Sequence, residues 1–248
     1  MADPTPLITV VVTIYNLGHF LAPCLTSLRN QTYQNYEVLL VDDHSTDESA
    51  TVADQWAQQE TNFTVTHLSK HSGVSVARNY GIEHANGAII VFVDGDDKCE
   101  PAYLATFAEG LADPNIDLVT VGSSWGGWAR GAVRQLSGWH EISQADMLAE
   151  ATEHGTQIGG YTWNKAFRMS VINQLKLRFD TSLALAEDLL FTAEYEAGTT
   201  HKFLFNPAIL YDKVSRPGST IHSATRQMRD REWEIDQRID DLRNHLAQ

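Results

Sequence analysis

Residues 88–97 read AIIVFVDGDD, six apolar residues followed by a segment in which three of the four residues are aspartate. An unbroken apolar run of this length is typical of a strand buried on both faces of a parallel sheet. In an open parallel α/β sheet, ligands bind in the crevice beyond the carboxyl ends of the strands. The sequence therefore predicts a buried strand over 88–93 that ends at an acidic, ligand-facing loop.

Two earlier segments repeat this pattern of a strand that ends in polar residues. Residues 7–14 form a β-rich run that ends near Thr13 and leads into Tyr15, and residues 37–41 lead into two aspartates. A short third strand is predicted over 65–68, and a helical pattern follows each strand. This alternation predicts an α/β fold with a Rossmann-like, mostly parallel central sheet flanked by helices. The strand ends gather polar residues at one rim, namely Thr13, Tyr15, Asn16, Asp42, Asp43, Asp94, Asp96 and Asp97.

Local signals mark where two of the helices begin. Ser45 and Glu48 have the spacing of a capping box, which predicts a helix from that point to about residue 59. Pro101 suits the first turn of a further helix. We expect both helices to pack against the sheet.

Beyond residue 115 the periodicity weakens. A strand is predicted over 117–122, a helix over 186–197, and two strands over 202–205 and 208–212 that an Asn-Pro pair separates. In the last 25 residues, apolar side chains spaced by four, three and four residues predict an amphipathic helix. This helix either covers the core or pairs two copies of the chain into a homodimer. The four apolar residues are Ile235, Ile239, Leu242 and Leu246.

Composition limits the partners and the compartment. The chain has 248 residues, 43% of them hydrophobic, which is enough for one large domain with a sizeable core. Its formal net charge of −14 at pH 7 repels a phosphate backbone, so we expect no nucleic-acid partner. An anionic ligand would require a divalent cation or local arginines. Two cysteines without ligand spacing, and the lack of an apolar run that could span a bilayer, predict a cytoplasmic protein.

The acidic loop suits a hard divalent cation. Asp94 and Asp96 are two residues apart at a strand end, so their carboxylates can point to the same side. Mg²⁺ or Mn²⁺ needs only two protein carboxylates when a substrate supplies the other oxygens. The small Gly95 would let a ligand approach the backbone. An acidic turn or a calcium loop is the alternative interpretation.

Other polar residues have structural interpretations as well as functional ones. The aspartate pair at 42–43 can cap a helix or bind a base or ribose, and Arg78 can form a surface ion pair or offset the charge of an anionic ligand. Glu187 and Asp188 can be helix N-terminal acids, or one of them can act as a general base. Arg216 begins a segment, 216–219, that forms a β-turn or closes over phosphates.

In order and spacing, six segments resemble the family 2 glycosyltransferases with the GT-A fold. The resemblance covers residue 8 to about residue 219. The segments are ITVVVTIYN (8–16), LLVDDHSTD (39–47), GVSVARNYG (73–81), VFVDGDD (91–97), WNKAFR (163–168) and Glu187-Asp188. One departure is His44, where glycine is frequent in the family; histidine tolerates a positive φ less well, so we expect an altered loop there.

This resemblance implies a GT-A domain over 1–222, with a nucleotide-sugar-binding half (1–115) and a smaller acceptor-side half (116–222), followed by the C-terminal helix (223–248). It implies transfer of a sugar, with inversion, from a nucleoside diphosphate donor, commonly a UDP-sugar. Asp188 would be the general base and Glu187 its neighbour that orients the acceptor or the sugar. The metal, Mn²⁺ or Mg²⁺, would be held by Asp96 with Asp94 and Asp97. The nucleotide-binding residues would be Thr13, Tyr15, Asn16, Asp42, Asp43, Arg78 and Asp94, and those on the acceptor or sugar side Trp163, Lys165, Arg216 and Ser219.

Several alternatives remain open at this stage. The enzymatic alternative is a nucleotidyltransferase, although the glycine-rich basic loop expected after its first strand is missing, and the other is a non-catalytic nucleotide-sugar-binding module. The expected acceptor is a saccharide, a lipid-linked sugar or a wall polymer, met at the inner face of the plasma membrane. The Trp-Gly-Gly-Trp segment at 125–128 fits either an acceptor-side aromatic platform or a glycine-rich hairpin.

Overall fold

The computed structural model describes residues 5–125, 137–151, 156, 158–199, 202–216 and 226–246, without the side chains of residues 151 and 226–232. Four parallel strands of its first half lie side by side: β1 (Ile8–Ile14), β2 (Tyr36–Asp42), β3 (Phe63–His67) and β4 (Ile89–Asp94). β1 lies between β2 and β4, with Thr13 opposite both Val41 and Asp94. This register brings three strand ends to one level, so the predicted polar rim is confirmed.

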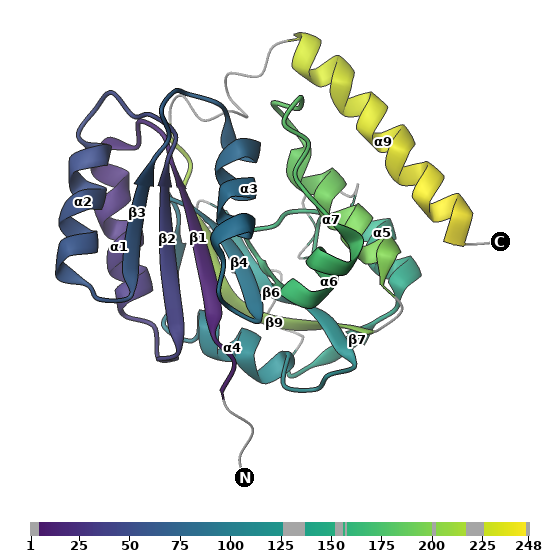
Figure 1. The fold of residues 1–248 in the computed structure, drawn as a ribbon. Helices are drawn as coiled ribbons and strands as arrows, with labels where there is room; N and C mark the ends of the chain where they lie inside the picture. Colours follow the sequence, from purple (N-terminus) through teal and green to yellow (C-terminus); the bar gives the residue numbers. More distant parts are fainter. Residues whose placement is uncertain are drawn as a thin grey trace.

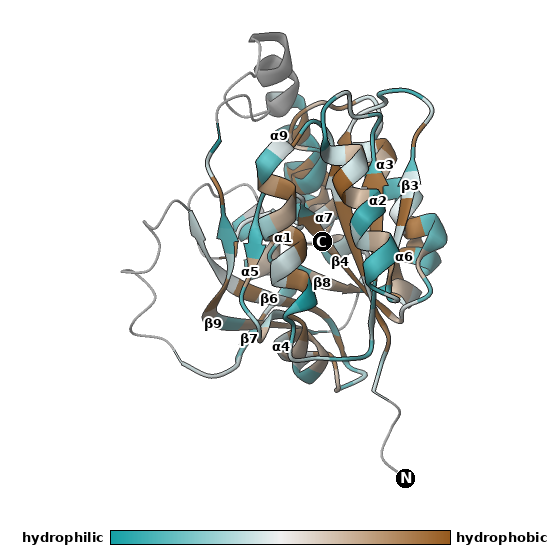
Figure 2. Cartoon of the chain, turned by 90° about the vertical axis from the view of Figure 1, so that its left-hand side faces the viewer, coloured by the Kyte–Doolittle hydropathy of each residue, from teal (hydrophilic) through white to brown (hydrophobic). Residues whose placement is uncertain are grey.

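Helices cover both faces of these strands. They are the short 3-10 helix η1 (Gly18–Phe20), α1 (Leu21–Arg29), α2 (Ser49–Gln59), α3 (Val74–His84) and α4 (Tyr103–Gly110). Successive strand residues point to opposite faces, so Val10 packs in the core cluster with α1 and α2, whereas Val11 packs in the cluster with α3. Figure 1 shows α1 and α2 on one side of the sheet and α3 on the other. In Figure 2 the hydrophobic colouring runs along the strands that these helices enclose.

Strands of the second half extend the same sheet. Its elements are β5 (Lys98–Cys99), β6 (Ile116–Trp125), β7 (His140–Ile142), α5 (Gln144–Ala151), β8 (Lys165–Arg168), α6 (Met169–Leu175), α7 (Glu187–Gly198), β9 (Lys202–Lys213) and α9 (Arg226–Leu246). Over the described residues the strand order is β3-β2-β1-β4-β8-β6-β9-β5, and β7 pairs with β9. β8 runs antiparallel to both β4 and β6, so it joins the two halves into one sheet. The predicted mixed fold, with a mostly parallel sheet between helices, is confirmed.

Three local predictions need correction. The capping box is wrong, because α2 begins at Ser49 and the Ser45 hydroxyl accepts a hydrogen bond from the Asn16 N–H, 3.0 Å away. Pro101 precedes α4 and its N-cap instead of lying in the first turn. The two strands predicted over 202–212 are one strand, β9, which stays paired with β6 through register shifts near Asn206 and Pro207.

The C-terminal helix α9 packs on its own chain. Ile235 and Ile239 are buried against Leu148 of α5 and Leu190 of α7, and Figure 1 shows α9 lying beside α7. The first part of the apolar stripe therefore covers the core, as one of the two hypotheses predicted, whereas Leu246 at its end is 44% exposed. The homodimer stays a prediction. None of the helices in the described ranges is long and apolar enough to cross a membrane.

Candidate active site

The acidic loop lies directly against the end of β1. The Gly95 N–H donates to the Thr13 carbonyl oxygen over 3.2 Å. A Cβ atom at Gly95 would lie 2.6 Å from Leu17 Cδ1 and 2.9 Å from the Thr13 oxygen. Glycine is therefore needed here because two segments of the chain approach closely, which is a different reason from the ligand access that the sequence suggested.

Arg78 of α3 joins the acidic loop to the start of α7. Its guanidinium donates to Glu187 Oε1 over 2.7 Å and to Asp94 Oδ1 over 3.1 Å, and its side chain is only 4% exposed. It also lies over the ring of Phe179, 5.2 Å from the centroid. Arg78 is thus a buried bridge between carboxylates 93 positions apart in sequence, and the surface ion pair considered for it is wrong.

A second contact fixes the segment before α7 against α3. The Asn79 side chain donates to the Phe179 carbonyl oxygen over 2.9 Å and accepts from the Phe179 N–H over 2.8 Å. Ala186 then adopts a φ of 59°, a left-handed conformation that redirects the chain into the helix. These contacts place Glu187 and Asp188 beside the ends of the parallel strands.

Asp188 lies in an environment that favours its protonated form. Burial raises the pKa of its carboxyl group to about 7, and the negative charges of Glu187 and Asp94 add to this effect, while Arg78 opposes it. Asp94 behaves in the opposite way. Burial disfavours its charged form, but the Lys213 ammonium and the Arg78 guanidinium outweigh burial and lower the pKa of Asp94. The pKa of Asp188 is therefore raised while that of its neighbour Asp94 is lowered. Such a difference between neighbouring carboxyl groups is common in active sites where one of them accepts a proton.

The end of β9 supplies a cation that the sequence did not reveal. Lys213 Nζ lies 2.9 Å from Asp94 Oδ2 and 3.0 Å from Asp97 Oδ2. The Tyr211 hydroxyl donates to Asp97 Oδ2 over 2.7 Å, and the Val214 N–H donates to Asp97 Oδ1 over 2.7 Å. Both oxygens of Asp97 are engaged by the chain and its side chain is fully buried, whereas that of Asp94 keeps 23% exposure; Asp97 therefore fits an anchor for the loop better than a direct metal ligand.

Asp96 has a basic partner as well. Arg216 Nε donates to Asp96 Oδ2, and both side chains are partly buried. Arg216 follows β9 by three residues, so it stands on the strand end that also carries Lys213. The structure thus brings Arg216 to the acidic loop.

Asp42 is a structural residue, and its predicted nucleotide-binding role needs correction. Its side chain is almost fully buried, Oδ1 accepts from the Ser45 N–H over 3.1 Å, and Oδ2 lies 2.8 Å from His67 Nδ1. These contacts leave the carboxylate turned into the chain. Like a capping residue, Asp42 accepts from a nearby backbone N–H, but its partners are Ser45 in a loop and His67 in a strand and not the first turn of a helix.

Asp43 fixes the loop that leads into α3. Its two oxygens accept from the Ser72 and Gly73 N–H groups, each over 2.7 Å. His71 of the same loop lies 2.7 Å from Asp43 Oδ2 and stacks on Tyr15, with 3.8 Å between the ring centroids and 14° between the planes. Tyr15 is 39% exposed, so Tyr15 and His71 form an open aromatic stack at the rim that sequence reasoning only half identified.

Asn16 and His44 shape the loops around this stack. Asn16 adopts a φ of 49° and its side-chain oxygen accepts from the Thr46 N–H over 2.8 Å. His44 adopts a φ of 66°, a left-handed conformation that glycine adopts more readily than histidine. The site of the predicted departure therefore has unusual backbone geometry.

Two of the residues predicted on the acceptor or sugar side are buried. Lys165 is fully buried and donates to the carbonyl oxygens of Ile158 and Gly159 over 2.8 and 2.5 Å, and burial lowers its pKa to about 8. This placement contradicts a direct contact with a sugar. Trp163 is also buried, with its ring stacked between Tyr161 and Tyr211, so its faces are not available either.

Two further features considered for the acceptor or sugar side are Ser219 and the Trp-Gly-Gly-Trp segment at 125–128. Ser219 lies outside the described residues, and so does most of the Trp-Gly-Gly-Trp segment, of which only Trp125 is described.

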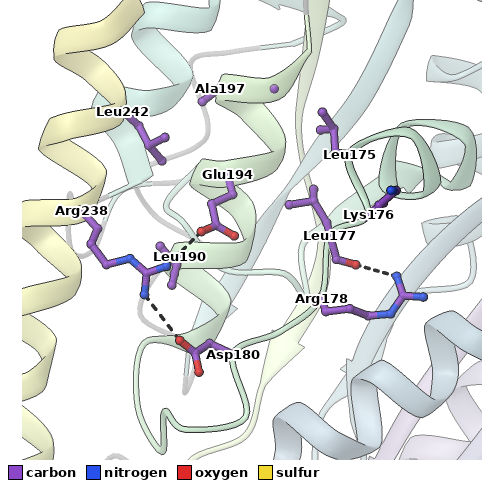
Figure 3. Close-up of a pocket in the computed structure, with 11 residues that line it drawn as sticks. Leu175, Lys176, Leu177, Arg178, Asp180, Leu190, Glu194, Ala197, Arg238 and Leu242 are labelled. Carbon is purple, nitrogen blue, oxygen red and sulfur yellow. Dashed lines mark hydrogen bonds and ion pairs between the residues drawn. The ribbon is translucent and has the colours of Figure 1, made fainter.

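A cavity of about 610 Å³ lies on another side of the molecule, between α6, α7 and α9 (Figure 3). Arg238 of α9 extends across it to Asp180 and Glu194, at 3.5 and 3.2 Å. None of the candidate residues lines this cavity. The site at the strand ends is therefore separate from it.

A metal would have to share its coordination with a ligand. Across the described ranges, no group of three or more His, Cys, Asp and Glu side chains is arranged to hold a metal ion. Mg²⁺ and Mn²⁺ prefer oxygen ligands and commonly bind through one or two carboxylates plus the phosphates of a substrate. Asp96 with Asp94 fits such an incomplete protein shell.

Comparison with known proteins gives a consistent family and fold. The family model described as glycosyl transferase family 2 matches residues 9–175. EpsJ of Bacillus subtilis (strain 168), an uncharacterized glycosyltransferase, is 31% identical over 193 residues, which is 75% of this chain and 55% of EpsJ. The chain spans about half the length of the curated relatives it matches first.

Solved structures share the fold at low identity. Residues 1–349 of S. aureus TarS, in complex with UDP-GlcNAc, align with a TM-score of 0.79 and 21% identity over 95% of this chain and 66% of that one. The mannosyltransferase PcManGT from Pyrobaculum calidifontis, in complex with GDP-Man and Mn²⁺, aligns with a TM-score of 0.68 and 23% identity over 88% and 59%. These likenesses confirm the GT-A type of α/β fold.

Proposed function

The chain belongs to glycosyl transferase family 2, and from this premise we propose that it transfers a sugar from a nucleoside diphosphate donor to a hydroxyl group of an acceptor. The observation that carries the proposal is the buried Arg78 bridge, which unites Asp94 of the acidic loop with Glu187, next to Asp188. Without such a bridge the two acidic motifs could serve unrelated parts of the fold. With it, one rim carries groups for binding a diphosphate and a carboxylate that can accept a proton.

We assign donor binding to the rim residues on β1, β2 and β4. The base would stack at Tyr15 and His71 and take hydrogen bonds near Thr13 and Asp43, whereas Asp94 would face the ribose. We propose UDP as the nucleotide, supported by the TarS complex with UDP-GlcNAc, which has the same fold. GDP remains the alternative that PcManGT represents.

A divalent cation, Mn²⁺ or Mg²⁺, would be held by Asp96 with Asp94. It would stabilise the negative charge that develops on the leaving diphosphate. Five carboxylates share the site with three cations, but the pKa values of Asp97 and Asp188 are raised to about 7, so the assignment rests on the partly exposed positions of Asp94 and Asp96 and not on excess negative charge. The carboxylates are Asp94, Asp96, Asp97, Glu187 and Asp188, and the cations are Arg78, Lys213 and Arg216. Asp97 anchors the loop in this proposal and binds no metal.

Asp188 would remove the proton from the acceptor hydroxyl as the oxygen attacks the anomeric carbon in a single, inverting displacement. Its raised pKa makes the carboxylate more basic than an exposed aspartate, which favours proton transfer near neutral pH. Glu187 would hold Arg78, and through it Asp94, in place.

The acceptor belongs to the second half of the chain. We propose a saccharide hydroxyl, carried by a lipid or by a wall polymer, and a reaction on the cytoplasmic side of the membrane. Flotation with liposomes that contain a lipid-linked saccharide, compared with plain liposomes, tests the lipid-linked form; equal recovery in both would remove it.

The main test separates donor binding from turnover in the Asp188→Asn variant. A thermal-shift panel of UDP- and GDP-sugars with and without Mn²⁺ first finds the donor, because a ligand of the native state raises its apparent stability. Donor hydrolysis or transfer is then measured. We expect the variant to bind the donor as the wild type does and to turn over about 10²- to 10⁴-fold more slowly.

Glu194→Gln is the matched control, since Glu194 lies on the same helix but faces Arg238. Wild-type turnover in the Asp188→Asn variant would refute the assigned base. A wild type that binds donors without turning them over would favour a binding module. Formation of UTP or GTP and a sugar phosphate from the nucleotide sugar and added pyrophosphate would favour a nucleotidyltransferase.

A further inference from the structure

Two basic residues at the end of β9 pair with all three carboxylates of the acidic loop. Lys213 Nζ bridges Asp94 and Asp97 at 2.9 and 3.0 Å, and Arg216 pairs with Asp96. Each of the three carboxylates in the loop therefore has a cationic partner from the same short segment. Any cation from solution must bind where the chain already supplies positive charge.

The two basic residues are held in different ways. Lys213 contacts two carboxylates and lies 5.6 Å from the centroid of the Trp163 ring. The Tyr211 hydroxyl donates to the Asp97 carboxylate and accepts from the Asp94 backbone N–H over 3.2 Å, so it holds the loop that carries both aspartates in place. Lys213 is therefore a fixed part of the loop.

Arg216 has a simpler attachment. Its Nε pairs with a single oxygen of Asp96, and Arg216 stands three residues beyond the last residue of β9. Its side chain retains 19% exposure, and that of Asp96 retains 12%. This pair can therefore separate without disturbing the contacts of Lys213.

Asp96 is also the carboxylate assigned to the divalent cation. A cation and Arg216 cannot both neutralise the same carboxylate oxygen at full strength, so binding of one weakens binding of the other. The guanidinium that leaves Asp96 would stay tethered within the donor site. Its planar fork of N–H donors matches the oxygens of a diphosphate, which brings negative charge to the same place.

We propose that Asp96 exchanges partners: Arg216 occupies it in the free protein, and a divalent cation replaces Arg216, which then binds the donor diphosphate. The inference rests on the proposed function, because it needs a nucleoside diphosphate ligand. It makes Arg216 a donor-binding residue, in place of the acceptor-side role that the sequence suggested. It also makes metal and donor binding cooperative, since the cation frees a ligand for the diphosphate.

The test measures binding, with the metal and the nucleotide titrated separately by calorimetry into the wild type and Arg216→Gln. For Mn²⁺ alone, we expect the variant to bind about tenfold more tightly, because its competitor at Asp96 is gone. For UDP or GDP, whichever the wild type binds in saturating Mn²⁺, we expect the variant to bind about tenfold more weakly. Opposite changes in the two affinities are the signature of the exchange.

Two further variants sharpen the result. Arg216→Lys keeps a positive charge but lacks the fork, so Mn²⁺ alone should bind as weakly as in the wild type while nucleotide binding falls. This variant also serves if Arg216→Gln does not fold. Arg238→Gln removes another arginine that pairs with two carboxylates, away from the site, and should change neither affinity.

Unchanged or weaker Mn²⁺ binding in Arg216→Gln would overturn the exchange, and so would unchanged nucleotide binding. A wild type that binds neither UDP nor GDP under any metal condition would instead refute the proposed function. The two failures are therefore distinguishable.

Discussion

Arg78 is the residue whose loss should most damage both the fold and the site. Replacing it by methionine keeps much of the side-chain volume but removes the buried bridge between Asp94 and Glu187. Asp94 would retain Lys213, whereas Glu187, which is almost fully buried, would lose the cation at 2.7 Å. The Glu187 carboxylate would then be a buried charge without its cation, and this lowers the free energy of unfolding.

The expected size follows from burial. Removing one partner of a buried ion pair costs about 3–5 kcal/mol, whereas an exposed pair contributes about 0–1 kcal/mol. Arg238 supplies the matched comparison, because it also bridges two carboxylates, Asp180 and Glu194, but is 50% exposed. In urea unfolding we expect Arg78→Met to lose roughly 3–5 kcal/mol and Arg238→Gln less than about 1 kcal/mol.

A double variant tests the mechanism of the loss. Adding Glu187→Gln to Arg78→Met neutralises the stranded carboxylate, so the double variant should be more stable than Arg78→Met by about 1 kcal/mol or more. If Arg78→Met cost no more than Arg238→Gln, or if Glu187→Gln gave no recovery, the idea that a buried bridge joins the two acidic motifs would be refuted.

Three other predictions concern the base, the last helix and the buried lysine. Because burial raises the pKa of Asp188 to about 7, kcat/KM should rise with pH through 7. The folded protein also keeps a proton on Asp188 that the unfolded chain releases near pH ~3.9, so the contribution of Asp188 to the free energy of unfolding should fall as the pH rises from about 4 to 7. The same pH dependence of unfolding in the wild type and in Asp188→Asn would contradict this. Ile239→Ala should lower the free energy of unfolding by about 2–5 kcal/mol, since Ile239 is fully buried, and the exposed Leu246→Ala should change it little; equal effects in urea unfolding would argue against docking of α9. Lys165→Met should cost about 1–3 kcal/mol, because the Gly159 carbonyl oxygen loses its Lys165 donor while the Ile158 carbonyl oxygen keeps only the Asn164 side chain as donor. We expect unchanged nucleotide affinity in calorimetry, and a folded variant that no longer bound the nucleotide would return Lys165 to the donor site.

Several features of the chain could be predicted from local sequence. The apolar runs of β1, β2 and β4 require burial on both faces, and the aspartates that end two of them mark the rim. The amphipathic stripe of α9 likewise follows from spacing. Local sequence did not predict which polar or aromatic residues contact other parts of the chain. Asp42, Lys165 and Trp163 look like ligand-binding residues in the sequence, but they are buried in contacts with their own chain.

The sequence by itself determined the α/β class and the strands with their polar ends, because hydrophobic burial and strand geometry act through near neighbours in the chain. The family followed from the resemblance of its ordered motifs to those of known proteins. Only the tertiary structure decided which charges meet. Arg78 reaches Glu187 across 109 positions and Lys213 reaches Asp97 across 116. Such pairs depend on β9 closing against β5 and on the first residue of α7 lying within reach of Arg78 on α3. No local pattern encodes the partner of a charge that lies so far away.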